Sequence, residues 1–466
     1  MEEQNKLGRH FILFLPWMMS LVLEPIPIAS YLVAWLGSFF IFYVSLTGKI
    51  KPLPKDRTFA EQLMRPIIIV QIIFAGFMAC SSIFYFLNVL GYKYLSKASG
   101  LLVFDEDILV VTAKCQQYYC LGHAAFVSGI LIFMKYPVKK KYYVEGDAIA
   151  NLLLLTALIL FPVSLLFLRL PGLSQFYYQC SSLSFIAGTL ALAFAIPLKK
   201  YTNTLVCLGL YIFNFYQALT SGYKEPVIIS VLVLGVFLYP NYKKIVTIVF
   251  GPALIMLFMI LPTYVNSFRG NVWAEGEEAG AASQAALDAA LNDENDDTNW
   301  NFLVYRLSEV DMFTKFVKST PEDVDFYGFK LLKQSGIALV PRIIWPSKPS
   351  TEELVMQRVY DAGVVNKNST VSAKPAFIVD AYLSFGATGI LVFLFLYGAA
   401  AQFIAVKAEE LFGGYVLGTA LIYSGLFQLL WRGLSFEFLI NNVFWSYVSM
   451  WIVFKILTSR NILKKV

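Results

Sequence analysis

Four cationic side chains stand at the ends of long apolar segments of this chain: Lys224, Arg269, Arg342 and Arg432. A charge placed within a membrane costs about 3 kcal/mol on insertion scales, so such residues usually face a helix bundle or a watery cavity. Guanidinium groups bind phosphate oxygens through paired hydrogen bonds, and an ammonium group adds a compact positive charge. The four residues therefore predict a site for a phosphate or pyrophosphate group, with snorkelling to the membrane surface as the alternative.

Two sequence features would prepare this site for an anion. The triplet from Thr220 to Gly222 precedes a short apolar segment that begins near Pro226, and the exposed amides of a helix start favour an anion. The segment from Val340 to Pro349 combines two cations with three prolines and an indole, and proline fixes the backbone before binding. The expected anion contacts are, first, Arg269, Arg342 and Arg432 and, second, Lys224, Arg306 and Lys348.

Three carboxylates near the same boundary are candidates for a general base that accepts a proton from a hydroxyl group: Glu225, Asp380 and Glu437. Each could instead be the ion-pair partner of a nearby cation. Trp345 could cover the apolar face of a sugar ring, and anchoring in the membrane interface is the alternative.

No metal or disulfide site is expected. Asp105, Glu106 and Asp107 form a short acidic turn, and the five cysteines follow no zinc or disulfide pattern. Gln116 and Gln117 are unusual in an apolar helix and could line a cavity, whereas His123 in the same segment is expected to be a hydrogen-bonded packing residue.

The composition indicates an integral membrane protein. Of the 466 residues, 58% are hydrophobic and 15% are charged, whereas soluble domains carry about 25% charge. Apolar runs of roughly 20 residues can each span a bilayer as a helix. Twelve spans are predicted, at residues 10–24, 27–47, 66–90, 108–134, 149–170, 176–197, 203–220, 225–240, 245–263, 375–406, 413–431 and 435–457. The basic balance fits anionic lipid headgroups and gives no reason to expect a nucleic acid.

The charge pattern orients these spans. Clusters of Lys and Arg fall on alternate sides, at residues 49–65, 135–141, 199–200, 243–244 and 455–465. Short basic loops stay in the cytoplasm, so both chain ends are expected there. Glu24 to Pro27 lacks the small residues of a signal-peptide cleavage site and predicts a tight helical hairpin.

One long polar insert, residues 264–374, interrupts the spans. It holds 16 of the 31 acidic residues and 11 of the 37 basic ones, and it is expected outside the cytoplasm. Apolar residues at three- and four-residue spacing predict an amphipathic helix over 301–317 and another over 327–345, on the membrane or packed on the bundle. Residues 276–297 are predicted to be a lid or a linker, with a possible surface helix at 281–290. The predicted divisions are spans one to nine (1–263), the insert (264–374), and spans ten to twelve with a cytoplasmic tail (375–466).

Across residues 205 to 450 the chain resembles the bacterial oligosaccharide repeat-unit polymerases of the O-antigen polymerase (Wzy) type, and more narrowly the enterobacterial common antigen polymerases. The resemblance is carried by Ser221-Gly222-Tyr223-Lys224, by Arg269, by Arg306 in the large loop, by Pro341-Arg342-Ile343-Ile344-Trp345-Pro346-Ser347-Lys348-Pro349, by Tyr382-Leu383-Ser384-Phe385-Gly386-Ala387-Thr388-Gly389, and by Trp431-Arg432-Gly433-Leu434. Family members commonly have Arg where this chain has Lys224.

The resemblance implies a GT-C-like, all-α polytopic fold and a glycosyltransferase of the bacterial inner membrane. The enzyme would move a glycan from one polyprenyl pyrophosphate to a second lipid-linked unit, without a cofactor or a metal. The cations would stabilise the departing pyrophosphate, and Lys224, Arg306, Lys348, Trp345 and Tyr382 would contact substrate. Expected partners are lipid-linked oligosaccharides, membrane lipids and, optionally, a chain-length regulator. A glycan ligase, a lipid-linked oligosaccharide transporter and an envelope assembly protein are the alternatives.

Overall fold

The computed structural model describes residues 8–58, 60–92, 105–170, 172–173, 176–274, 276–292, 300–368, 372–427, 430 and 433–466. This part of the chain is almost entirely helical. Its one sheet pairs β1 (Tyr142–Tyr143) with β2 (Lys464–Lys465) in antiparallel register. The all-α class predicted from the sequence agrees with this architecture.

The helices follow the chain in three groups. Before the insert lie η1 (Ile12–Phe14), α2 (Leu15–Val22), α3 (Pro27–Leu46), η2 (Ala60–Gln62), α4 (Ile69–Gln71), η3 (Ile72–Cys80), α5 (Ile83–Val89), α7 (Glu106–Phe133), η4 (Gly146–Ala148), α8 (Ile149–Arg169), α9 (Phe176–Ala195), α10 (Tyr201–Leu219) and α11 (Lys224–Arg269). The insert contains η5 (Gly270–Ala274), α12 (Ala279–Asn292), η6 (Leu303–Leu307), α14 (Val310–Ser319), α15 (Lys330–Leu339) and α16 (Thr351–Asp361). After it come α17 (Phe377–Leu411), η7 (Val416–Tyr423), α18 (Ser424–Leu426) and α20 (Phe436–Ser459).

Seven helical stretches in the described residues are long and apolar enough to cross a membrane, which agrees with an integral membrane protein. They are Pro27–Leu46, Ile69–Val89, Ile149–Arg169, Phe176–Ala195, Pro226–Val272, Phe377–Leu411 and Phe436–Ser459. Helices also occupy the other ranges predicted as spans: the shorter apolar helices Gly8–Val22 and Val416–Leu426, together with α7 and α10.

The helix α11 is a folded-back pair. Its backbone leaves the helical region at Tyr242, with φ −131° and ψ 42°, two residues after Pro240, which has no N–H for the helical hydrogen-bond ladder. A Cβ at Gly235 would lie 3.0 Å from the Phe250 ring, so the two halves run side by side. This break agrees with the separate apolar ranges 225–240 and 245–263 predicted from the sequence.

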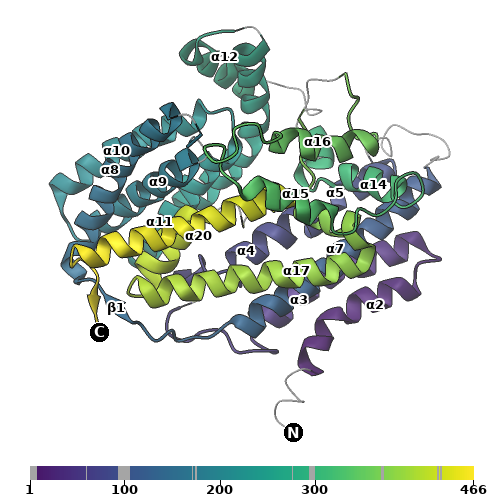
Figure 1. Cartoon of the computed structure of the whole chain (residues 1–466), viewed down its shortest axis with the longest axis horizontal. Coiled ribbons are helices and arrows are strands. Elements are labelled where there is room, and N and C mark those ends of the chain that lie inside the picture. The colour runs from purple at the N-terminus through teal and green to yellow at the C-terminus, as the bar shows by residue number, and fades with distance from the viewer. Residues whose placement is uncertain are drawn as a thin grey trace.

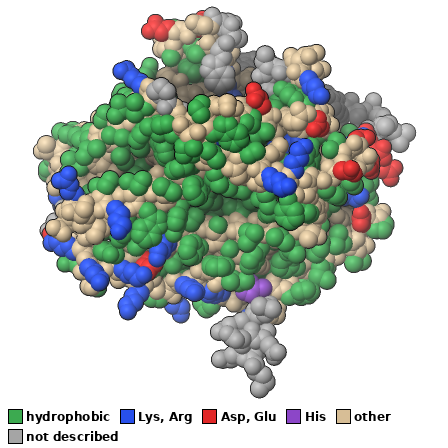
Figure 2. All heavy atoms as spheres, viewed as in Figure 1, with side chains coloured by type: hydrophobic (Ala, Val, Ile, Leu, Met, Phe, Trp, Pro, Cys, Tyr) green, Lys and Arg blue, Asp and Glu red, His purple; other side chains and the backbone are tan. Residues whose placement is uncertain are grey.

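The helices of the insert and the carboxyl end of the chain lie on opposite faces of the molecule. In Figure 1, α12 and α16 stand on the upper face, while β1 and the carboxyl end of the chain lie at the lower face. Figure 2 shows a broad hydrophobic band between the two faces, with Lys and Arg side chains gathered along its lower edge. The described part of the insert and the carboxyl end of the chain therefore lie at opposite edges of this hydrophobic band.

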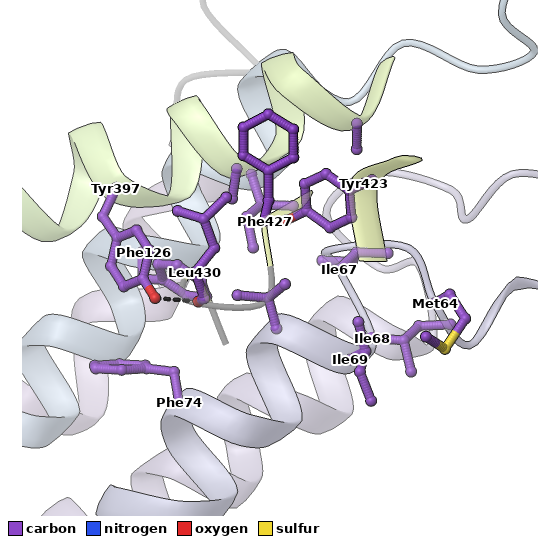
Figure 3. Packing of buried hydrophobic residues seen from close by; sticks show 14 of the residues in the cluster. Met64, Ile67, Ile68, Ile69, Phe74, Phe126, Tyr397, Tyr423, Phe427 and Leu430 are labelled. Carbon is purple, nitrogen blue, oxygen red and sulfur yellow. Dashed lines mark hydrogen bonds between the residues drawn. The ribbon is translucent and has the colours of Figure 1, made fainter. Parts of the chain in front are cut away.

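The centre of the bundle is the crossing of α7 and α17. A Cβ at Gly129 would overlap the Phe395 carbonyl oxygen, and one at Gly398 would overlap that of Phe126, so only glycine permits this close approach. Aromatic rings fill the space beside the crossing, and the rings of Phe126 and Tyr397 lie 5.1 Å apart. Figure 3 shows the Tyr397 hydroxyl reaching the Leu430 carbonyl, to which it donates a hydrogen bond.

The helix α17 breaks near its start. Phe385 has φ −150° and ψ 29°, and Gly386 has φ 60°, a value that favours glycine. The break leaves carbonyl groups without helical partners, and the insert supplies them: Tyr327 N donates to Leu383 O at 2.9 Å and Gly328 N to Ser384 O at 3.0 Å. The sequence from Tyr382 to Gly389 therefore ties the insert to a span.

The insert packs on the bundle through helices that the sequence largely predicts. The helix α12 covers the predicted 281–290 range, and α14 buries Phe313 with its ring 5.4 Å from that of Tyr119 in α7. The predicted helix over 301–317 is divided, because Glu309 adopts a left-handed φ of 56° between η6 and α14. The predicted range 327–345 contains α15, which ends at Leu339.

Candidate functional site

The strongest polar constellation lies where α16 of the insert meets the starts of α17 and α20. Arg358 Nε and Nη2 donate to the two carboxylate oxygens of Asp380, both at 2.8 Å. Its Nη1 and Nη2 donate to the Glu437 oxygens at 2.9 and 2.7 Å. One guanidinium group therefore holds two carboxylates in paired geometry, which only arginine provides.

Local sequence explains why Arg358 lies there. The helix α16 begins with a capping box, in which the Ser350 hydroxyl accepts from Glu353 N and the Glu353 carboxylate accepts from Ser350 N. Val355 and Val359 are fully buried on the face that carries Arg358. The apolar face of α16 therefore directs the guanidinium into the bundle.

Asp380 and its neighbours on α17 also bond the backbone that leads into α20. Asp380 Oδ2 also accepts from Phe436 N at 2.8 Å, and Phe377 N donates to Gly433 O at 2.6 Å. Trp431 and Arg432 themselves lie outside the described residues. Their described neighbours Leu430 and Gly433 each accept a hydrogen bond from α17, from the Tyr397 hydroxyl and from Phe377 N respectively.

Asp380 and Glu437 occupy the ion-pair role weighed for them from the sequence. Both side chains are fully buried, and Arg358 is 1% exposed. A general base must reach its substrate directly or through one water, and burial behind α16 separates these carboxylates from the surface. Their partner is Arg358, a residue the sequence analysis did not single out.

Arg269 meets the turn that precedes α11. Its Nε donates to Gly222 O at 2.8 Å, and its guanidinium carbon lies 5.3 Å from the centre of the Tyr223 ring. Gly222 has a φ of 71°, which glycine allows without strain. The structure therefore brings together Arg269 and the helix start that the sequence predicts as an anion site.

Arg342 and Lys348 lie in a compact turn after α15. Arg342 is exposed, and its Nη1 donates to Lys348 O at 3.2 Å. Lys348 Nζ donates to Ala338 O at 3.0 Å and to Val340 O at 2.6 Å, so it caps the carboxyl end of the helix. Burial, and secondarily the Arg342 charge, lower the pKa of Lys348. The structure supports a capping role for Lys348 rather than direct contact with substrate.

Two aromatic candidates have clear structural contacts. Tyr382 donates its hydroxyl proton to Thr320 O at 2.7 Å, and its ring lies 5.0 Å from that of Tyr118. It is buried, so it contributes to packing between α17 and the insert. Trp345 is 39% exposed and donates from Nε1 to the Ser347 hydroxyl at 3.2 Å.

The remaining candidates fall outside the described side chains. Lys224 and Glu225 open α11, and Arg306 belongs to η6, but the side chains of all three lie outside the described part of the structure. Where the structure is described, no group of three or more His, Cys, Asp or Glu residues is placed to hold a metal ion.

The glutamines predicted to line a cavity instead join helices. Gln116 Nε2 donates to Ala79 O at 3.0 Å, and Gln117 Nε2 donates to the Ser30 hydroxyl at 2.8 Å. His123 Nε2 shares a 3.1 Å hydrogen bond with Gln71 Nε2 and is fully buried, which confirms its packing role.

The comparisons with known proteins give a family without an assigned activity. A family model described as a domain of unknown function (DUF8712) matches residues 15–465. The chain belongs to this family. No curated protein and no solved structure matches the chain.

For this member of the DUF8712 family, functional roles rest on the residues themselves. The sequence analysis found both carboxylates of the buried constellation but missed Arg358. A signal was present: Ser350 and Glu353 carry the capping-box spacing directly after Pro349, and Arg358 follows on the same short helix. Two acids at the ends of apolar spans require a cation, and this helix supplies it.

Proposed function

We propose that the protein is a membrane glycosyltransferase that polymerises polyprenyl-pyrophosphate-linked oligosaccharide repeat units into a surface polysaccharide. It would act at the outer face of a bacterial cytoplasmic membrane, through twelve spans with both chain ends in the cytoplasm. Its substrates are two lipid-linked oligosaccharides, one as donor and one as acceptor. Membrane lipids surround it, and a chain-length regulator is an optional partner.

The observation that best supports this proposal is the contact of Arg269 with the turn before α11. An arginine bonded to Gly222 stands beside the start of a long helix, at the end of an apolar hairpin. Helix starts and guanidinium groups both favour phosphate oxygens. This pairing suits an anionic group carried by a lipid, because in the proposed orientation the site would lie at the outer membrane surface.

The chemistry needs fixed positive charge beside the leaving group. Breaking the anomeric C–O bond gives the electron pair to the pyrophosphate oxygen, while the acceptor hydroxyl oxygen forms the new bond to the sugar and loses its proton to a base. Negative charge grows on the pyrophosphate as the bond breaks, so cations stabilise the transition state more than the ground state. Arg269, Arg342 and Arg432 are the proposed leaving-group contacts, and no metal is required.

The buried ion pairs of Arg358 with Asp380 and Glu437 would hold the outer site in place without touching substrate. Arg358 joins the insert to the starts of α17 and α20, and Asp380 accepts a hydrogen bond from Phe436 N, four residues after Arg432 in the sequence. A catalytic cation must stay within a fraction of an ångström of its place to stabilise a transition state. We therefore assign Arg358, Asp380 and Glu437 to positioning of the outer site.

Reconstituted protein given lipid-linked repeat units alone tests the proposal. A polymerase would lengthen the glycan in steps of one repeat unit and release one polyprenyl pyrophosphate for each step. A ligase would extend only a different added acceptor, and a transporter would move the units across the bilayer without changing their length. The absence of longer glycan and of released polyprenyl pyrophosphate would reject the polymerase.

A chelator provides a second arm of the same experiment. The reaction is expected to continue at an unchanged rate in excess EDTA, because side-chain cations stabilise the leaving group. If EDTA abolished the activity and added Mg²⁺ or Mn²⁺ restored it, a metal ion would be what stabilises the leaving group.

A further inference from the structure

The turn after α15 presents an apolar tip to the surface. Ile343 is 60% exposed and Ile344 is 73% exposed, next to the partly exposed Trp345. Three consecutive large apolar side chains at the surface are unusual in a folded protein and mark an interaction site. We call residues 343–345 the tip.

The backbone beneath the tip is held in one conformation. Ile344 N and Trp345 N both donate to Pro341 O, at 3.0 and 3.1 Å, and Lys348 N donates to Trp345 O at 3.2 Å. The buried Lys348 ammonium group then closes the turn from below, through the helix-end carbonyls described above. The tip is therefore a rigid projection, and little conformational entropy is lost when it enters another phase.

The tip stands at the end of helices that face lipid. A Cβ at Gly172 would lie 3.0 Å from Ile343 N, which places the tip against the turn between α8 and α9. The most apolar stretch of α8 is only 17% buried, although its mean hydropathy is 2.4. Its exposed side chains continue to that turn, with Leu158 at 45% and Leu168 at 55% exposure. The apolar surface of the tip is thus continuous with a lipid-facing helix.

The charge beside the tip matches the headgroup layer. Arg342 is exposed directly before Ile343, and the structure gives its guanidinium group backbone carbonyls as partners, Pro346 O and Lys348 O. Indole and guanidinium groups both favour the membrane interface, with apolar side chains below them in the acyl region. Arg342 and Trp345 would therefore lie in the headgroup layer, and Ile343 and Ile344 between them would reach the acyl chains.

We propose that the tip enters the bilayer leaflet on the side of the insert, with Ile343 and Ile344 among the acyl chains and Arg342 at the level of the lipid phosphates. The insert would then be anchored to the membrane by its own surface, in addition to its contacts with the spans. This inference goes beyond the glycosyltransferase proposal and stands without it. At this depth, Arg342 also lies in the layer that holds the phosphates of lipid-linked substrates.

Spin-label depth measurements on the full chain in phospholipid vesicles test this placement. A nitroxide at Ile344→Cys, on a chain whose five native cysteines are replaced, should collide more with oxygen than with a water-soluble nickel complex. Leu158→Cys on α8 supplies the lipid-facing standard, and Gln357→Cys on the exposed side of α16 supplies the aqueous standard. Ile344→Cys with the oxygen-to-nickel ratio of Gln357→Cys would overturn the proposal.

Tryptophan quenching gives an independent readout that needs no cysteine replacement. In vesicles of phospholipid brominated near the headgroup, part of the fluorescence should be quenched, and Trp345→Phe should remove part of the quenched fraction. If Trp345→Phe removes only fluorescence that the brominated lipid leaves unquenched, Trp345 lies outside the bilayer and the tip does not enter it.

Discussion

At the scale of single residues, burial decides what the charged side chains can do. Asp380 and Glu437 were candidates for a base and for ion pairing, and the structure gives them a shared guanidinium partner. A buried charge that loses its partner costs several kcal/mol, since neither water nor a counter-ion replaces it. The three groups therefore depend on one another.

Arg358→Ala should lower the free energy of unfolding by about 3 kcal/mol or more, because it leaves two buried carboxylates unpaired. Arg358→Lys should recover only part of this loss, since an ammonium group cannot bond four oxygens in two planes. The measurement is thermal unfolding of the purified protein in detergent.

Arg460→Ala is the matched control, because Arg460 is exposed at the end of α20. Its unfolding temperature should equal that of the unchanged protein. Equal unfolding temperatures for Arg358→Ala and Arg460→Ala would contradict the role given to the buried constellation.

At the scale of elements, glycines set where helices break and cross. Apolar runs of about 20 residues predicted the ranges of α3, α8, α9 and α20, because a helix that faces lipid is apolar all round. They did not predict the break in α17, because a change in φ at one glycine leaves no trace in the hydropathy. The short helix α16 was also missed, since one turn of buried valines is too brief a pattern.

Gly389→Ala should destabilise the protein by about 2 kcal/mol, because its Cβ would overlap the Ala381 carbonyl oxygen beside the break in α17. Gly336→Ala on α15 is the control, since nothing lies within 4 Å of a Cβ there. That change should be neutral or slightly stabilising, because alanine favours helix. If Gly389→Ala and Gly336→Ala changed the unfolding temperature equally, the close contact of Gly389 with the Ala381 carbonyl at the break in α17 would be contradicted.

Gly398→Ala tests the crossing of α7 and α17 in the same way. The added methyl group would overlap the Phe126 carbonyl oxygen, so the helices would have to separate. We expect a lower unfolding temperature and a smaller yield of monodisperse protein. Gly251→Ala on α11, which has open space around its Cβ, should leave both quantities unchanged.

At the scale of the whole molecule, the two faces differ in charge. The sequence predicted this polarity from the acidic insert and the basic loops, since their charge is counted directly from the residues. Which of the predicted cations lie close to one another was harder to predict, because it depends on which helices and turns pack together. Arg269 contacts the turn before α11, while Arg342 lies in the turn after α15 near Gly172.

The predicted orientation can be measured with a membrane-impermeant maleimide on intact cells. Gln357→Cys in the insert should react from outside, and Lys139→Cys in the basic loop before β1 should react only after the cells are permeabilised. Both side chains are exposed, so burial does not limit either reaction. Reaction of Lys139→Cys from outside would reverse the orientation.

The central claim is that side-chain cations at the outer face drive release of a lipid pyrophosphate. Its most direct measurement is the amount of polyprenyl pyrophosphate released per repeat unit added, for the unchanged protein, Arg269→Ala and Arg460→Ala. The account predicts one release per addition for the unchanged protein and for Arg460→Ala, and at least a hundredfold slower release for Arg269→Ala, the scale of one lost transition-state contact. Undiminished release by a folded Arg269→Ala protein, or none by any of the three, would contradict it.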